Sequence, residues 1–101
     1  MRVDIYWTKM AQEDLRSIKE HISRDAPATA VAYIRKLKAA VGRLEEMPYS
    51  GQVVPELKRE EIREVLLGNY RLIYRIRDQQ VVILTVYHGA RLLDDSTFQG
   101  T

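Results

Sequence analysis

The stretch from Ile62 to Gly89 contains three runs of alternating or continuous apolar residues, separated by two short turns. The middle run extends from Tyr70 to Arg77, where side chains point alternately to two faces of a strand. Its apolar face, predicted to lie in the core, carries Tyr70, Leu72, Tyr74 and Ile76. Its other face carries three arginines and one apolar residue, Arg71, Ile73, Arg75 and Arg77.

The third run, Val81 to Tyr87, is apolar at nearly every position and rich in Val and Ile. Such a run is typical of a strand that is covered on both faces, so it is predicted to be the central strand. We expect Met1 to Trp7 on one side of it and Tyr70 to Arg77 on the other. The predicted turns are Gly68-Asn69 and Asp78-Gln79-Gln80, both short enough for hairpins.

Upstream of this stretch, the apolar positions change to a helical period. After a short strand over Arg2 to Trp7, Thr8 is placed to cap a helix that runs to about Ser23. Pro27 suits the first turn of a second helix, which is predicted to end near Met47-Pro48. The apolar stripes are Ala11, Leu15, Ile18 and Ile22 in the first helix and Ala30, Ile34, Leu37, Val41 and Leu44 in the second.

Two segments lack either period. Pro48 to Arg59 is predicted to be an ordered loop held by Val53, Val54 and Leu57, and the tail after Gly89 is predicted to be irregular. The predicted order is therefore β-α-α-β-β-β within one domain spanning residues 1–101. This order predicts an α+β fold in which two N-terminal helices pack on one face of an antiparallel sheet.

Composition narrows the class of protein. Hydrophobic residues make up 46% and charged residues 30% of the 101 positions, which is typical of a globular domain. No apolar run approaches the about 20 residues of a membrane span, and the N-terminus lacks the apolar core of a secretion signal. A cytoplasmic protein is expected. A net charge of +2 is too small to indicate a dedicated nucleic-acid binder.

The sequence lacks the residues that most classes of enzyme use for catalysis. The chain has no Cys and only two His, so neither a metal site nor a thiol nucleophile is expected. Its five glycines match no nucleotide-binding fingerprint, so no cofactor is predicted. His88, with Arg91 nearby, could act as an acid-base group, although a strand-end His bound to the backbone is the favoured interpretation. His21 is expected on a helix surface.

The arginines form the one candidate functional surface. Guanidinium groups suit phosphate or carboxylate partners, and the alternative is a solvated strand face that protects a sheet edge. The residues of this predicted basic surface are Arg63, Arg71, Arg75, Arg77 and Arg91. Three strand tyrosines could stack on bases, but packing against the helices is favoured for Tyr70, Tyr74 and Tyr87.

Three motifs carry a resemblance to a known family. They are VVPEL at 53–57, IREVLLGNYRLIYRI at 62–76 and VVILTVYHGARLL at 81–93. Together with the predicted element order, they resemble the RelE/ParE superfamily of type II toxins over nearly the whole chain. The resemblance implies a small toxin that is neutralised by a cognate antitoxin in a hetero-oligomer. It also implies one of two targets: RelE-like members cut messenger RNA in the ribosome, whereas ParE-like members inhibit DNA gyrase.

Residue by residue, the resemblance separates these two targets. Arg63, Arg71 and Arg91 fall on three of the basic positions of RelE-like nucleases. A further basic position falls on or near Val65, and the C-terminal tyrosine position falls near Thr97 or Phe98. His88 is then the only acid-base group for activating a 2′-hydroxyl.

The incomplete set favours the ParE-like, plasmid stabilisation branch and a gyrase poison without catalysis. A ribosome-dependent endoribonuclease that uses Arg71, Arg91 and His88 is the alternative. A third interpretation is a binding protein that has lost its toxicity.

Overall fold

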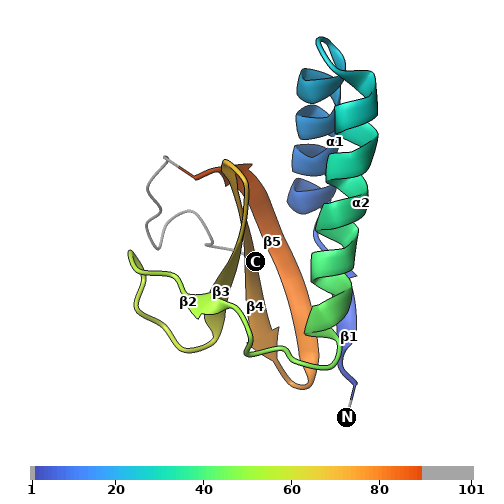
Figure 1. The fold of residues 1–101 in the computed structure, drawn as a ribbon. Coiled ribbons are helices and arrows are strands. Elements are labelled where there is room, and N and C mark those ends of the chain that lie inside the picture. The colour runs from blue at the N-terminus through green and yellow to red at the C-terminus, as the bar shows by residue number, and fades with distance from the viewer. Residues whose placement is uncertain (1, 90–101) are drawn as a thin grey trace.

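A computed structural model describes residues 2–89, which contain two helices and a five-stranded sheet. In chain order the elements are β1 (Asp4–Trp7), α1 (Lys9–Ser23), α2 (Pro27–Leu44), β2 (Gln52–Val53), β3 (Ile62–Leu67), β4 (Tyr70–Arg77) and β5 (Gln80–His88). The helices lie side by side on one face of the sheet, and the loop that carries β2 lies on the other side (Figure 1). The predicted α+β class is confirmed. The predicted irregular tail lies outside the described residues.

Both helices begin where the sequence predicts. The Thr8 hydroxyl accepts a hydrogen bond from the Ala11 N–H at 3.1 Å, which caps α1. Pro27 opens α2, where a missing N–H has no helical partner to lose. The second helix ends at Leu44, earlier than predicted, and the chain turns before it reaches Pro48.

The strand order is β1-β5-β4-β3-β2, so β4 and not β5 is the middle strand, whereas β5 is interior and has the two predicted neighbours, β1 and β4. The sheet is mixed rather than wholly antiparallel, because β1 runs parallel to β5 while the other pairs are antiparallel. Strands separated by a long helical connection are free to pair in parallel, whereas hairpin partners are not. The loop predicted over Pro48 to Arg59 also contributes the two-residue strand β2.

The turns confirm the hairpin predictions. Asp78 and Gln79 both have positive φ, at 50° and 61°, which fits the two-residue turn that suits the twist of β4 and β5. Gly68, at φ 60°, opens the turn between β3 and β4.

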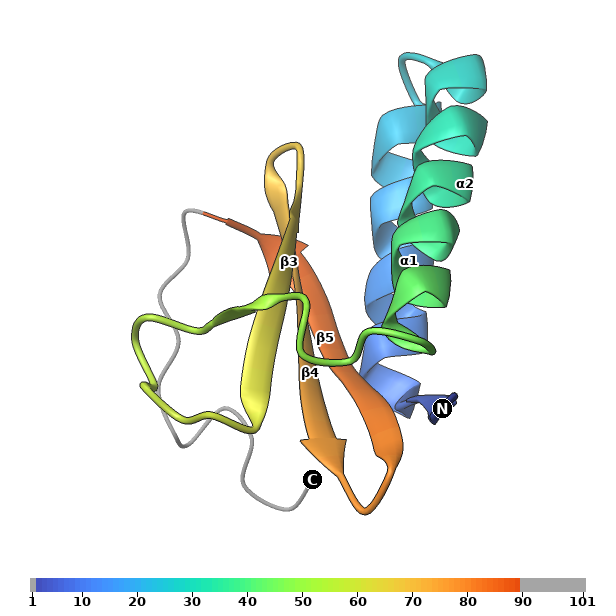
Figure 2. The same ribbon diagram turned by 60° about the horizontal axis from the view of Figure 1, so that its bottom comes forward.

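Two apolar clusters lie on the two faces of the sheet. The larger lies between the helices and the sheet and includes Leu37, Leu44, Leu72, Tyr74 and Ile83, all at most 1% exposed. The smaller joins Val54 and Leu57 of the loop to Ile62, Ile73 and Leu84. Figure 2 shows the helices and this loop on opposite sides of the strands. The arginine-bearing face of β4 is therefore partly covered by protein.

The pairing of β4 with β5 shifts in register between Ile73 and Tyr74. Ile73 pairs with Thr85, but Tyr74 pairs with Ile83, which leaves Leu84 without a partner in β4. The Asp14 carboxylate of α1 accepts hydrogen bonds from the Thr85 hydroxyl and from a neighbouring backbone N–H. This contact fastens α1 to β5 at the bulge.

Candidate functional site

The predicted basic surface does not form one patch. Arg63 pairs across β3 and β4 with Tyr74, whose side chain faces the helices, whereas Arg71 points to the opposite face beside Ile73. The sequence analysis grouped Arg63 with the β4 arginines, and this grouping is wrong because the two side chains occupy opposite faces. Arg77 is exposed, with its Nε 3.8 Å from the Asp78 carboxylate. Arg91 lies outside the described residues.

Arg71 is buried and held by two carboxylates. Its Nη1 and Nη2 donate to the two oxygens of Glu56 at 2.6 and 2.8 Å, a bidentate pair. Its Nε donates to Oε1 of Glu64 at 2.7 Å, and its Nη2 lies 2.6 Å from the same oxygen. The other oxygen of Glu64 accepts from the Gln52 side-chain amide at 2.6 Å. We call these three charged residues, Glu56, Glu64 and Arg71, the carboxylate–arginine cluster.

The electrostatics of this cluster keep the arginine charged. The hydrogen bonding of Arg71 to the Glu56 carboxylate raises the pKa of Arg71 well above its usual range, burial opposes that shift, and Glu64 and Tyr87 add to it. The Tyr87 ring centroid lies 5.7 Å from the guanidinium carbon. Two carboxylates against one guanidinium give the cluster a formal charge of −1.

A groove of about 720 Å³ runs past the cluster. His88 and Tyr70 line it together with Arg71, and the His88 and Tyr70 rings meet edge to face with centroids 5.9 Å apart. His88 ends β5, is exposed, and lines this groove together with Arg71 and the two carboxylates. The groove thus brings together two of the three residues predicted for RNA cleavage.

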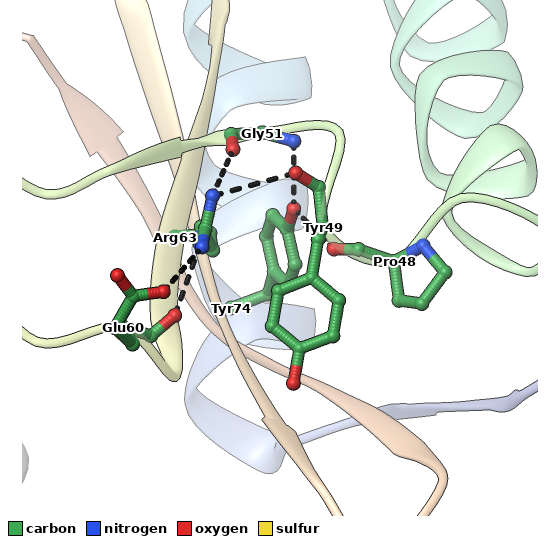
Figure 3. A network of polar contacts seen from close by, with 6 residues as sticks. All are labelled: Pro48, Tyr49, Gly51, Glu60, Arg63 and Tyr74. Atoms are coloured by element: carbon green, nitrogen blue, oxygen red, sulfur yellow. Dashed lines mark hydrogen bonds and ion pairs between the residues drawn. The ribbon is translucent and has the colours of Figure 1, made fainter.

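Arg63 binds the loop that carries β2, as Figure 3 shows. Its Nη1 donates to the carbonyl of Gly51 at 3.1 Å, and its Nε and Nη2 donate to the backbone and carboxylate oxygens of Glu60 at 2.9 and 3.0 Å. Its guanidinium carbon lies 5.1 Å from the centroid of the Tyr49 ring. These contacts tie both ends of the loop that carries β2 to β3, so Arg63 acts as a structural clamp.

Tyr74 holds the same loop from the core (Figure 3). Its hydroxyl donates to the Pro48 carbonyl at 2.7 Å and accepts from the Gly51 N–H at 3.0 Å. Burial raises the pKa of this hydroxyl. A Cβ added to Gly51 would lie 2.5 Å from the hydroxyl oxygen, so only glycine permits this close approach. Tyr74 is fully buried and cannot stack on a base, as the favoured interpretation predicted.

The two carboxylates were missed by the sequence analysis. Glu64 occupies an inward position of β3, two residues after the buried Ile62, and is only 3% exposed. A charged residue at a buried position of a strand indicates an internal ion pair, and that signal was available. Glu56 offered no comparable signal because it lies in a segment without periodicity.

Other site types find no support among residues 2–89. No three His, Asp or Glu side chains in this range are clustered in a way that could hold a metal ion. Neither described helix is long and apolar enough to cross a membrane.

Known proteins resemble this chain over most of its length. Residues 5–93 match a family model described as the ParE toxin of the type II toxin–antitoxin system, parDE. The chain is 32% identical over 88 residues to Toxin RelE2 of Caulobacter vibrioides. The aligned region covers 87% of this chain and 97% of that protein.

Solved structures agree in fold. A chain of the chromosomal ParDE system from P. aeruginosa superposes with a TM-score of 0.72 at 20% identity, covering 86% of this chain and 96% of that one. A chain of the RelBE2 toxin–antitoxin complex from Mycobacterium tuberculosis superposes with a TM-score of 0.59 at 30% identity, covering 87% and 99%.

Proposed function

We propose, from the premise that this chain belongs to the ParE toxin family of type II toxin–antitoxin systems, that it poisons DNA gyrase by binding to it. In this proposal the toxin works by contact and cuts no RNA. A cognate antitoxin holds it inactive, and both proteins act in the cytoplasm, where gyrase is found.

The state of Arg71 is the observation that carries the proposal. RNA cleavage needs a guanidinium that is free to stabilise the charge developing on the scissile phosphate. Here four hydrogen bonds or close ion contacts engage that group with Glu56 and Glu64. A phosphate would have to displace the bidentate Glu56 carboxylate before it could reach the guanidinium.

The other residues of the nuclease set support the same conclusion. Arg63 is engaged by Glu60 and by loop carbonyls on the far face of the sheet. Val65 is partly buried against the helix-side core, and its side chain brings no positive charge. Neither residue assists chemistry beside Arg71.

A ribosome-dependent endoribonuclease remains the second candidate, and two observations favour it. His88 and Arg71 line one groove, so an acid-base group and a cation lie in the same concavity. A relative at 32% identity also bears the name RelE2. In this alternative His88 would activate the 2′-hydroxyl, and Glu56 would have to leave Arg71 before RNA could bind.

Solved structures with a similar fold support control by an antitoxin. One solved neighbour is a chain of a ParDE system, and another comes from a RelBE2 toxin–antitoxin complex. We infer that this chain likewise forms a hetero-oligomer with the product of a neighbouring reading frame.

A supercoiling assay tests the proposal. Purified toxin is added to gyrase, ATP and relaxed plasmid, and the expected result is loss of supercoiling with accumulation of linear DNA after detergent treatment. Prior addition of the antitoxin should restore supercoiling. Arg77→Ala should weaken the inhibition a few-fold, because an exposed contact residue contributes in a graded way. Normal supercoiling at a large molar excess of a toxin that still arrests cell growth would overturn the proposal.

A further inference from the structure

A smaller cavity, of about 290 Å³, lies at the end of the sheet where β3 begins and β4 ends (Figure 2). We call it the arginine cavity, because three of the five described residues that line it are arginines. These five residues are Arg59, Glu61, Arg75, Ile76 and Arg77. Three positive charges and one negative charge give the lining a formal charge of +2, which equals the net charge of the whole chain.

Two chain segments bring the guanidinium groups together. Arg75 and Arg77 are two residues apart on β4, so they share one face of the strand at a spacing of about 7 Å. Arg75 pairs with Ile62, a member of the smaller apolar cluster, so this is the face that the loop covers. The loop supplies Arg59. The cavity shares no lining residue with the groove beside the carboxylate–arginine cluster.

The acidic neighbours of this cavity hold its rim arginines weakly. The Nε of Arg59 lies 2.7 Å from Oε1 of Glu61, and both side chains are exposed. The Nε of Arg77 lies 3.8 Å from a carboxylate oxygen of the exposed Asp78. Exposed ion pairs contribute little because water competes for both partners. An incoming anion can therefore displace them at small cost, unlike the buried bidentate pair that holds Arg71.

The three arginines lie at different depths. Arg75 is half-buried and its Nε is shielded from solvent, whereas Arg59 and Arg77 are exposed. Arg75 is therefore the inner group, and the other two form the rim. Guanidinium groups are planar forks whose N–H donors match the oxygen spacing of a phosphate. A phosphate at the mouth of the cavity can thus contact the inner group and the rim together.

The lining also indicates the class of partner. Ile76 is the one apolar residue among the described residues of the cavity, and it is only 8% exposed. Protein partners usually bury aromatic or aliphatic anchors at the centre of an interface, and this cavity offers no apolar surface for one. Surfaces that bind nucleic acid are more polar and more positively charged. The lining therefore fits the sugar–phosphate backbone better than an acidic protein surface.

The same face of the sheet extends the contact toward β1. Tyr6 pairs with Val82, which pairs with Arg75, so the three side chains form one row across the sheet. Tyr6 is exposed and lies two strand spacings, or about 10 Å, from Arg75. Its hydroxyl can donate to a phosphate oxygen. The next row joins Arg77 to the exposed Asp4, whose charge repels phosphate and so favours the row of Tyr6.

We propose that Arg59, Arg75 and Arg77 form a phosphate site for the backbone of double-stranded DNA, with Tyr6 as an outer contact. DNA as the ligand rests on the proposed function, because gyrase holds a duplex while the toxin acts on it, whereas the position rests on the arginine cavity. Binding to DNA alone is weak, at about 10⁻⁴ to 10⁻⁶ M, as is usual for contacts that read no sequence. On gyrase the duplex is held nearby, which raises its effective concentration.

The salt dependence of DNA binding tests the site in the full-length toxin. Fluorescence anisotropy with a labelled duplex of roughly 20 base pairs, at salt concentrations of roughly 20 to 200 mM, gives the slope of log K against log salt. Three phosphate contacts predict a slope of about −2.7, and Arg75→Gln with Arg77→Gln should reduce it to about −0.9. Because Arg75 is half-buried, Arg59→Gln with Arg77→Gln repeats the test at two exposed residues and should give the same reduced slope.

A matched control separates the cavity from net charge. Lys19→Gln with Arg35→Gln removes the same two charges from exposed helix positions outside the cavity, and should leave the slope at about −2.7. Arg75→Lys keeps the charge but loses the planar fork, so it should weaken binding several-fold at an unchanged slope.

Gyrase supplies the second measurement. Surface plasmon resonance compares the binding of the toxin to gyrase alone and to gyrase that already holds a duplex. The wild type should bind the complex with DNA at least about tenfold more tightly. Arg75→Gln with Arg77→Gln should lose most of that gain while binding gyrase alone as the wild type does.

Each outcome decides one part of the proposal. If the double variant keeps the wild-type slope, or if the wild type does not bind the duplex at the lowest salt, the arginine cavity is not a phosphate site. If single-stranded RNA binds at least about tenfold more tightly than the duplex, DNA is the wrong ligand. If the wild type does not bind gyrase, the proposed function fails, and the slope measured on the duplex alone still decides the site.

Discussion

Replacing Arg71 with methionine removes the guanidinium while keeping a side chain of similar length. The change leaves Glu56 and Glu64 facing each other without the cation that engages both in the native fold. We expect a large loss in the free energy of unfolding, because two like charges then share a partly enclosed site.

The magnitude follows from burial. Glu64 is 3% exposed, and removing one partner of a buried ion pair costs about 3 to 5 kcal/mol. The side chain of Glu56 is 17% exposed and can turn toward water, so it adds less. Gln52 continues to donate to Glu64 at 2.6 Å, which places the expected loss toward the lower end of that range. A loss of about 3 kcal/mol is a large part of the about 5 to 15 kcal/mol that stabilises a domain.

Urea unfolding followed by the fluorescence of Trp7 measures this loss, since Trp7 is the single tryptophan of the chain. Arg77→Met is the matched control: its side chain is 71% exposed, so its free energy should change by less than about 0.5 kcal/mol. Adding Glu56→Gln and Glu64→Gln to Arg71→Met should recover part of the loss, because neutral amides leave no unpaired charge. A loss below about 1 kcal/mol for Arg71→Met, with an unchanged slope against urea, would refute the structural role.

Three further predictions concern the rest of the fold. Leu37→Ala should cost about 2 to 5 kcal/mol in urea unfolding, because its side chain is 0% exposed between α2 and the sheet, and a loss under about 0.5 kcal/mol would contradict that position. Tyr74→Phe should cost about 1 to 3 kcal/mol, since it removes the hydroxyl partner of the partly buried Pro48 carbonyl and Gly51 N–H, and proteolysis within the loop should become faster. Burial, with a smaller effect of the neighbouring Tyr70, raises the pKa of Tyr33 from 10.0 to about 12, so the unfolded chain loses this proton first and stability should fall between pH 10 and 12. Tyr33→Phe should flatten that fall, and an identical pH profile for the variant would contradict the assignment.

Local periodicity predicted most of the elements because most of them gather their apolar residues on one face. Thr8 and Pro27 marked both helix starts, since their chemistry satisfies or removes the unpaired N–H groups of a first turn. The interior position of β5 followed from its apolar composition. These features depend on residues close together in the chain.

Other features depend on contacts between distant residues and left no local pattern. The parallel pairing of β1 with β5 joins Asp4 to Gln80 across the whole domain. The loop that covers the second face is irregular, so nothing local indicated that Val54 and Leu57 would cover the face bearing Arg71. An arginine face that alternation predicts as open is therefore closed by a segment whose path only the fold reveals.

The central claim is that Arg71 supports the fold and that this toxin does not cut RNA. Mapping the 5′ ends of messenger RNA by primer extension on translating ribosomes, with and without the purified toxin, tests it most directly. The account predicts the same ends in both samples at toxin concentrations that block gyrase. Codon-specific cuts that occur with the wild type, and disappear with a folded Arg71→Lys variant, would contradict it.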